Sequence, residues 1–323
     1  MSENIDFSSK HFVIHSLAEG IFAAIATDGG HAICNSGLVD LGGQLIVFDT
    51  CLTPQAASDL RRFATARYGP TPQLVINSHY HNDHIWGNQV FAADAPIISS
   101  DRTRALIATS GMEEFNWYSA NSAQQLQSLR DQYQSAEDEC QRKELLLWMG
   151  EYEGVVEALP QLKVCLPNVT FDGRLKIFSA KRSCELMNFP NGHSGSDTVL
   201  HLPQDGIVFM GDLLFVGCHP YLGDGDPFML LNSLRELSLL DAACYVPGHG
   251  QAGTVADVHM LIEYIEECLD TAQTLLKTGK PGDSKIKEIK VPEKYADWQV
   301  SKFYPSNINF ICQCLSSSIT RSG

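Results

Sequence analysis

The sequence has no run of about twenty apolar residues, which is the length that an α-helix needs to cross a lipid bilayer. It also lacks the basic residues and apolar stretch with which a secretory signal begins, because residues 1–7 are acidic and polar. These two absences predict a cytoplasmic protein with no membrane partner.

Basic residues are scarce, since the chain has 23 Lys and Arg against 38 Asp and Glu and a net charge of −15. Proteins that bind RNA or DNA attract the polyanion with basic surfaces or arms. Here the basic groups at 61–62, 181–182 and 285–290 are short or interrupted. We therefore expect a small-molecule substrate and no nucleic acid, unless distant basic residues gather in the folded chain.

The ten cysteines are scattered over 323 residues without a secretory signal. Disulfide scaffolds are short secreted chains, so we expect mostly buried thiols. Cys312 and Cys314 have no second pair at matching spacing and do not predict a metal site. Nothing in the sequence sets the oligomeric state, and a homo-oligomer stays an open alternative.

Strand-like and helical patterns alternate in the first eighty residues. Apolar runs at 21–27, 31–39 and 73–77 predict strands. Residues 53–68 predict a helix, which Thr53 would cap. This alternation is typical of a layered α/β fold, and 44% hydrophobic residues are enough for a sizeable core.

Residues 102–160 have a helical composition, rich in Glu, Gln, Ala, Leu and Arg with few glycines. We predict one domain over 1–323, with a helical insertion at about 102–160 and a C-terminal helical extension at about 255–323. Some aromatic residues of the insertion would form the wall of a lid over the site, or else pack on the body of the protein, which we favour for most of them. They are Phe115, Trp117, Tyr118 and Trp148.

The run His-Tyr-His-Asn-Asp-His at 79–84 places four potential metal ligands in six residues, directly after a predicted strand. Alternation along an extended chain lets His79 and His81 point the same way toward one ion, while Asp83 and His84 face a second after the turn. A loop held by a rigid strand is a common place for a metal site.

Three later segments repeat this arrangement, because an apolar stretch again ends in a glycine-flanked His or Asp. Glycine lets the backbone turn sharply beside an ion. The residues at these positions are His193, Asp212 and His249.

In their order along the chain, these motifs resemble those of the metallo-β-lactamase superfamily from Asp49 to His249. The resemblance implies an α/β (α+β) fold, a four-layer αββα sandwich with a helical insertion. Asp49 would support the metal loop as a hydrogen-bond acceptor rather than as a ligand. The resemblance also implies that two divalent metal ions are held by seven side chains. The first ion would have His79, His81 and His193, the second Asp83, His84 and His249, and Asp212 would bridge the two.

Such a ligand set implies a metal-dependent hydrolase. Two ions about 3.5 to 4 Å apart share a hydroxide that is nucleophilic near neutral pH. This metal-bridged hydroxide would attack a small ester, thioester, lactone or amide, and Asp83 or the second ion would help the leaving group depart. The imidazoles favour zinc (Zn²⁺), while the carboxylate of Asp212 would also accept manganese, iron or cobalt.

The loop that follows Asp212 is expected to leave the metal centre directly. Its residues His219 and Tyr221 are candidates for orienting the substrate or stabilising an oxyanion. The alternative is that His219 only shapes a turn and that Asp224 and Asp226 are solvated.

Two departures from the zinc β-lactamases bear on the substrate. Many of those enzymes have Cys at the position of Asp212 and Lys three positions later, where this chain has Phe215. The chain therefore more closely resembles the thioesterases and lactonases of the superfamily, and β-lactam hydrolysis is the alternative. The alternative of another class is a non-catalytic metal-binding or redox protein, although the oxygen reductases of the superfamily usually have Glu in place of one motif histidine.

Overall fold

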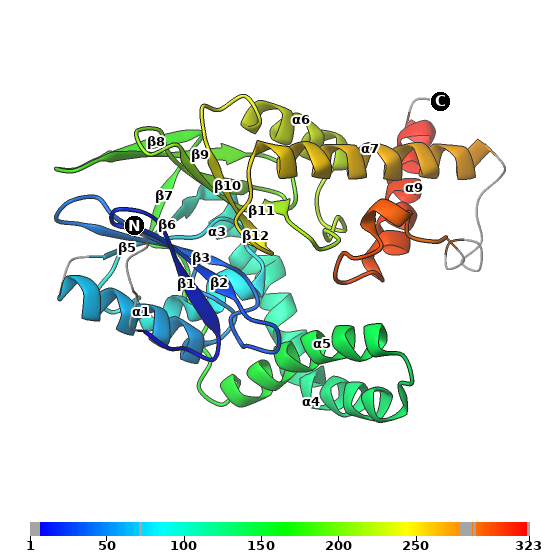
Figure 1. The fold of residues 1–323 in the computed structure, drawn as a ribbon, viewed down its shortest axis with the longest axis horizontal. Coiled ribbons are helices and arrows are strands. Elements are labelled where there is room, and N and C mark those ends of the chain that lie inside the picture. Colours follow the sequence, from blue (N-terminus) through cyan, green and yellow to red (C-terminus); the bar gives the residue numbers. More distant parts are fainter. Residues whose placement is uncertain (1–6, 71–72, 278–285, 287–288, 322–323) are drawn as a thin grey trace.

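Two β-sheets form the centre of the computed structural model, which describes residues 7–70, 73–277, 286 and 289–321 (Figure 1). The first sheet has seven strands in chain order: β1 (Phe12–Ala18), β2 (Ile21–Ala26), β3 (Ser36–Asp40), β4 (Leu45–Phe48), β5 (Gln73–Ile76), β6 (Ile97–Ser100) and β7 (Val169–Phe171). The second sheet has the order β12 (Cys244–His249), β11 (Ile207–Phe215), β10 (Asp197–Leu202), β9 (Ser183–Phe189) and β8 (Arg174–Phe178).

Parallel strand pairs position the site. β4 to β7 are parallel, and β11 pairs in parallel with β12. Helix α1 (Pro54–Tyr68) makes the crossover between β4 and β5 and begins as predicted, with Thr53 Oγ1 accepting a hydrogen bond from the Ala56 N–H (3.2 Å). The carboxyl ends of β4 and β5 therefore lie at one edge, as do those of β11 and β12.

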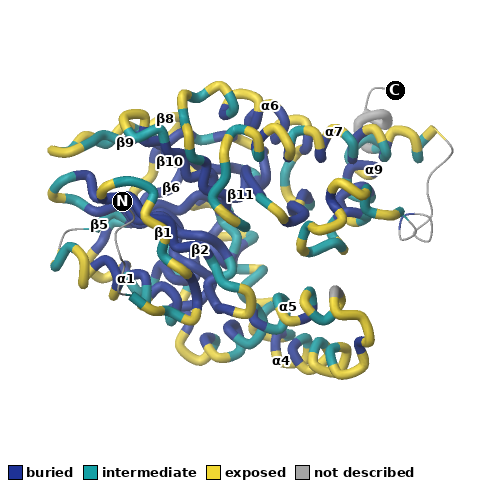
Figure 2. The backbone as a smooth tube through the Cα atoms, viewed as in Figure 1, coloured by how far each residue is buried: buried dark blue, intermediate teal, exposed yellow. Residues whose placement is uncertain are grey.

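Apolar side chains fill the space between the sheets, where the rings of Phe48 and Phe209 lie 5.9 Å apart. A second apolar cluster joins the outer face of the first sheet to α1. A third joins the second sheet to α6 (Pro227–Leu237) and α7 (Val255–Lys277). The strands between the helical layers are largely buried (Figure 2). This order of layers is the predicted αββα sandwich.

Helices occupy the segment expected to form the insertion: α3 (Asp101–Leu106), a π-helical turn (Ile107–Gly111), α4 (Met112–Ser135) and α5 (Glu139–Ala158). Figure 1 shows α4 and α5 extending side by side from the sandwich. The rings of Phe115 and Tyr118 pack edge-on against Trp86, at 5.9 and 5.5 Å. These two residues therefore pack on the body of the protein.

The C-terminal region adds a 3₁₀ turn (Glu293–Tyr295) and α9 (Phe303–Arg321), and α9 packs beside α7 (Figure 1). Buried residues of both helices, such as Ile265 and Ile308, belong to the same apolar cluster. Within the described residues, none of the helices has both the length and the apolar character needed to span a bilayer.

The strand expected at 31–39 begins later than predicted, because β3 starts at Ser36. Ile33 has a left-handed backbone (φ 66°). The N–H of Asn35 donates to the Gly248 carbonyl (2.7 Å), and Asn35 Nδ2 donates to the Pro247 carbonyl (2.9 Å). These bonds tie the segment before β3 to the end of β12, and its contact with β2 is a side-chain bond in which Asn35 Oδ1 accepts from the Ala26 N–H (3.0 Å).

Candidate metal centre

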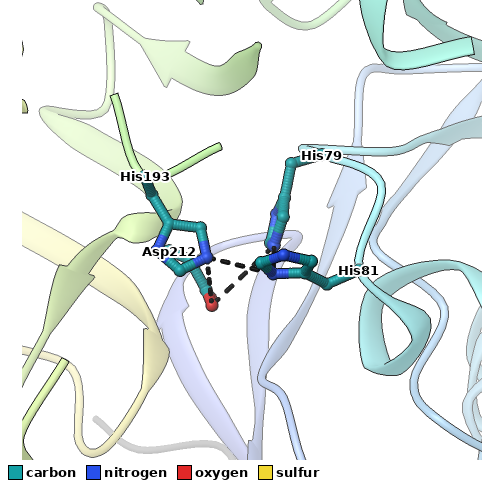
Figure 3. A group of neighbouring side chains, drawn as sticks. All are labelled: His79, His81, His193 and Asp212. Carbon is teal, nitrogen blue, oxygen red and sulfur yellow. Dashed lines mark hydrogen bonds and ion pairs between the residues drawn. The ribbon is translucent and has the colours of Figure 1, made fainter. Parts of the chain in front are cut away.

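Three imidazoles and one carboxylate converge beyond the end of β5 (Figure 3). His81 Nδ1 lies 3.0 Å from His79 Nε2 and 3.1 Å from His193 Nε2. Asp212 Oδ2 lies 3.3 Å from His193 Nε2 and 3.8 Å from His79 Nε2. Four potential ligand atoms thus surround one point.

A second group shares Asp212 with the first. Asp212 Oδ1 lies 3.1 Å from His84 Nε2, and Asp212 Oδ2 lies 3.3 Å from His249 Nε2. Asp83 Oδ2 lies 3.4 Å from each of these two imidazole nitrogens. The carboxylate of Asp212 therefore stands between two sets of side chains.

Strand ends bring these residues together. The residues at 79–84 follow β5 and run into the one-turn helix α2 (Asn82–Ile85). His193 lies between β9 and β10, and His249 is the last residue of β12. Gly248 is required next to it, because a Cβ there would lie 1.9 Å from Asp212 Oδ1. The glycine thus lets β12 approach the carboxylate.

Asp49 determines which nitrogen of two imidazoles faces the centre. Its Oδ2 accepts hydrogen bonds from His84 Nδ1 (2.8 Å) and from the Ser78 hydroxyl (2.7 Å). Because Ser78 gives its hydrogen to Asp49, His79 Nδ1 donates to Ser78 Oγ (2.9 Å). Both imidazoles therefore carry a proton on Nδ1 and turn Nε2 toward Asp212.

His81 is held the other way round. Its Nε2 donates to Asp224 Oδ2 at 2.7 Å, and the same oxygen accepts from the Tyr80 hydroxyl. The unprotonated Nδ1 of His81 is then the atom that faces His79 and His193. Asp224 orients this imidazole.

Burial disfavours charge on Asp212, but the imidazoles of His249, His84 and His193 outweigh burial and hold its pKa well below the ordinary value. Burial, assisted by His84, lowers the pKa of His79 well below its usual range, and burial lowers the pKa of His193 to about 3. Burial also acts to lower the pKa of His249, but the charge of Asp212 outweighs burial, and the pKa of His249 is raised. His79 and His193 thus offer neutral imidazoles beside an ionised carboxylate, which are the protonation states of metal ligands. At His81, by contrast, Asp224 and Glu114 outweigh burial and raise the pKa.

The geometry fits a divalent ion. Tetrahedral bonds of about 2.0–2.1 Å place ligand atoms about 3.3 Å apart, and the separations in the first group run from 3.0 to 3.8 Å. In the described part of the chain, the buried His84 Nε2 and Asp212 Oδ1 have no hydrogen-bond partner, although they lie 3.1 Å apart. A cation between them would satisfy both atoms.

The family model of the metallo-beta-lactamase superfamily matches residues 29–249, which include every residue of this centre. The chain belongs to the metallo-beta-lactamase superfamily. With its cluster of His and Asp side chains, it is a metal-dependent hydrolase that binds divalent metal.

Solved structures of the superfamily share the fold. A metallo-beta-lactamase from Pontibacter korlensis is similar with a TM-score of 0.57 at 16% identity, over 79% of this chain and 99% of that chain. TMB-1 is similar with a TM-score of 0.56 at 15% identity, over 80% of this chain and 98% of that chain. No curated protein matches the sequence.

This superfamily member places both Tyr221 and His219 in the lining of the cavity beside the metal centre. The ring of Tyr221 lies 6.1 Å from that of His81 and 6.3 Å from that of His193. His219 is buried, and its Nδ1 lies 3.0 Å from the Tyr264 hydroxyl. Burial lowers its pKa to about 4. Its Nε2 is buried and has no hydrogen-bond partner among the described residues, and its catalytic role stays a prediction.

Phe215 lies three residues after Asp212, at the position where many zinc β-lactamases have a Lys. Its ring stacks on His249, with centroids 5.2 Å apart and planes 13° apart, and it also lies 5.7 Å from the ring of His193. An apolar side chain thus covers two imidazoles of this metallo-beta-lactamase-like centre.

Sequence reasoning missed three residues at this site. Asp224 had no predicted role beyond the alternative that it is solvated, although its place in the loop after Asp212 was a signal. Cys34 donates its thiol hydrogen to the Asp83 carbonyl (2.9 Å), and burial raises the pKa of that thiol well above its usual value. Glu114 of α4 lines the adjoining cavity of about 620 Å³. No motif marked Cys34 or Glu114.

Proposed function

We propose that this chain uses two divalent ions to hydrolyse a small ester, thioester, lactone or amide. The first ion is assigned to His79, His81 and His193, the second to Asp83, His84 and His249, and Asp212 to both. The observation that supports this assignment is the position of Asp212, whose Oδ1 and Oδ2 lie 3.1 to 3.3 Å from imidazole nitrogens of both groups.

When bound, such ions supply Lewis acidity and lower the pKa of water, so that hydroxide is available near neutral pH. The side chains around the ions would orient the ligands and transfer protons. Asp49 and Asp224 orient the imidazoles of His84 and His81 through hydrogen bonds of 2.8 and 2.7 Å. Asp83 lines the cavity, and we assign it the transfer of a proton to the leaving group.

Tyr221 also lines the cavity, and its ring centre lies 6.1 Å from that of His81 and 6.3 Å from that of His193. Its hydroxyl is assigned to orienting the substrate, because burial raises its pKa and keeps its proton in place as a hydrogen-bond donor. Phe215 limits the access of water from its side.

Zinc is the proposed metal, since the site is rich in imidazole nitrogen. Manganese, iron and cobalt are the alternatives, because Asp212 and Asp83 add hard oxygen ligands. Elemental analysis of the purified protein, with the number of ions per chain, tests both the identity and the two-ion stoichiometry.

The activity test uses zinc-loaded protein on one panel of lactones, thioesters, esters, amides and β-lactams. We expect Asp212→Ala to lose turnover by more than about a hundredfold. Loss of a residue that only hydrogen-bonds to a metal ligand already lowers metal affinity or activity about 10- to 100-fold, and Asp212 is proposed to be a ligand itself. Asp241→Ala is the matched control, since Asp241 is exposed just before β12. Circular dichroism checks that both variants fold.

Wild-type rates in Asp212→Ala with its metal retained would contradict the bridging assignment. Absence of turnover on the whole panel would contradict the proposed reaction class. Turnover confined to β-lactams would favour the antibiotic-hydrolysing alternative, although most β-lactam drugs carry a carboxylate that would meet an acidic cavity.

A further inference from the structure

The cavity of about 620 Å³ beside the metal centre has an acidic lining. Within the described residues, no Lys or Arg lines it. Acidic side chains other than the assigned metal ligands line it at five positions. They are Asp28, Glu114, Glu151, Asp224 and Asp297. Outside the proposed metal centre, the described lining therefore offers no Lys or Arg to pair with an anionic substrate.

Three of these carboxylates already accept hydrogen bonds. Asp224 accepts from His81 (2.7 Å), Glu151 from the Tyr118 hydroxyl (2.6 Å), and Asp28 from Gln299 (3.3 Å). Glu114 differs, because its Oε2 is buried and receives no hydrogen bond from any described residue. Buried carboxylate oxygens normally have a donor.

The surroundings of Glu114 make its negative charge costly. Burial raises its pKa to about 7, and the carboxylates of Asp83, Glu151 and Asp224 add to the effect, while His81 opposes it. A cationic group placed at Oε2 would supply both the missing hydrogen-bond donor and the missing counter-charge.

Lys302 does not supply that charge. Its Nζ lies 3.3 Å from the centre of the Trp148 ring, and its charge acts on Glu144 and Glu151. Glu114 is not among the groups that shift the pKa of Lys302. The acceptor on Glu114 therefore stays available to a ligand.

Three aromatic side chains line the same cavity as Glu114, and they are those of Tyr118, Trp148 and Phe303. Trp148 Nε1 is buried without an acceptor among the described residues, so it offers a hydrogen bond to a polar atom of the ligand. Lys302 already occupies one face of the Trp148 ring, while a cavity lined by carboxylates and by the rings of Tyr118 and Phe303 is a setting that recognises ammonium ions.

We propose that the substrate is an amine-bearing acyl compound, bound as its ammonium ion, and that Glu114 selects it by accepting a hydrogen bond from the ammonium group. This substrate class rests on the hydrolase function proposed above. Glu114 is thus the specificity-determining residue contributed by the insertion.

The turnover test compares an alanyl thioester that has a free amine with its N-acetyl derivative and with the isobutyryl thioester. We expect the wild-type protein to prefer the free amine by about tenfold or more in kcat/KM, the effect of one charge-assisted hydrogen bond. Glu114→Gln should lose this preference through a higher KM for the amine only. Glu113→Gln is the matched control, because Glu113 is exposed on the same helix.

A binding test separates this inference from the hydrolase proposal. Titration calorimetry on the zinc-loaded protein compares the 2-phenylethylammonium ion with the neutral 2-phenylethanol, neither of which is hydrolysed. We expect the ammonium ion to bind about tenfold more tightly to the wild type and to Glu113→Gln, and the preference to vanish in Glu114→Gln.

Equal binding of the two probes by the wild type would overturn the inference. So would a preference that survives Glu114→Gln, or a loss of zinc from that variant, because the amine or the carboxylate would then act at the metals. If no thioester is hydrolysed but the preference for the ammonium probe depends on Glu114, the hydrolase proposal is contradicted, while the inference that Glu114 binds a cationic ligand is supported.

Discussion

His81 Nε2 lies 2.7 Å from Asp224 Oδ2, although 143 residues separate the two in the chain. Asp224 accepts a second hydrogen bond from Tyr80. The pair fixes the proton of His81 on Nε2 and leaves Nδ1 as the nitrogen that faces His79 and His193. A carboxylate on the loop after β11 thus determines how a histidine after β5 can bind metal.

Substituting Asp224 tests this relationship. Asp224→Asn removes the carboxylate that holds His81, so we expect metal affinity at the first group to fall about 10- to 100-fold. Competition with a chromophoric chelator measures the change.

Asp226→Asn is the control for that experiment. Asp226 is exposed in the same loop and caps α6 by accepting from the N–H groups of Phe228 and Met229. Asn preserves such a cap, so the affinity should not change. Equal losses in the two variants would show that the loop, rather than the carboxylate, is responsible.

Asp49→Asn should weaken the second group. Asp49 is buried with a left-handed backbone (φ 58°), which Asn tolerates, so the substitution isolates the charge. Loss of the acceptor for His84 and Ser78 should lower the free energy of unfolding by about 1–3 kcal/mol. Urea unfolding of the metal-free protein measures it.

The control for Asp49 is Asp59→Asn. Asp59 forms a surface ion pair with Arg62 at 3.0 Å, so its loss should cost at most about 1 kcal/mol. A stability change in Asp49→Asn no larger than this would contradict the role assigned to the buried carboxylate.

Glu151→Gln should change how stability depends on pH. Burial raises the pKa of Glu151 from 4.5 to about 7. Between these pH values the folded chain holds a proton that the unfolded chain has released, so this residue makes the free energy of unfolding decrease as pH rises. Gln has no such proton, and the variant should gain up to about 3 kcal/mol over the wild type from pH 4 to pH 8.

Urea unfolding of metal-free protein at several pH values measures this difference. Glu137→Gln is the control, because Glu137 is exposed next to the same helix. A difference between Glu151→Gln and the wild type that stays constant with pH would contradict the raised pKa.

Local patterns were enough to predict much of the fold. The apolar runs before the His motif and before His249 are strands β5 and β12, and Thr53 caps α1. Each of these features depends on residues within a few positions, where periodicity and capping act. The segment at 31–35 was wrong as a strand, because Asn35 bonds to Pro247 and Gly248, far away in sequence.

The seven proposed ligands could be chosen from the sequence, because the run at 79–84 and the later glycine-flanked His and Asp residues resemble, in their order, the motifs of the superfamily. The orientation of three imidazoles, those of His79, His81 and His84, depends on Asp49, Ser78 and Asp224. Asp49 was expected in this role from the resemblance, whereas Ser78 and Asp224 are polar residues with no pattern of their own.

The sequence by itself determined the strands before the His motif and before His249, the cap of α1 and the set of His and Asp side chains, since these depend on residues close together in the chain. Only the tertiary structure decided the burial of His219, the contact between His81 and Asp224, and the unpartnered oxygen of Glu114. The physical reason is that burial and hydrogen-bond partners are properties of packing between distant segments, and helix α4 meets the sandwich only once the chain has folded.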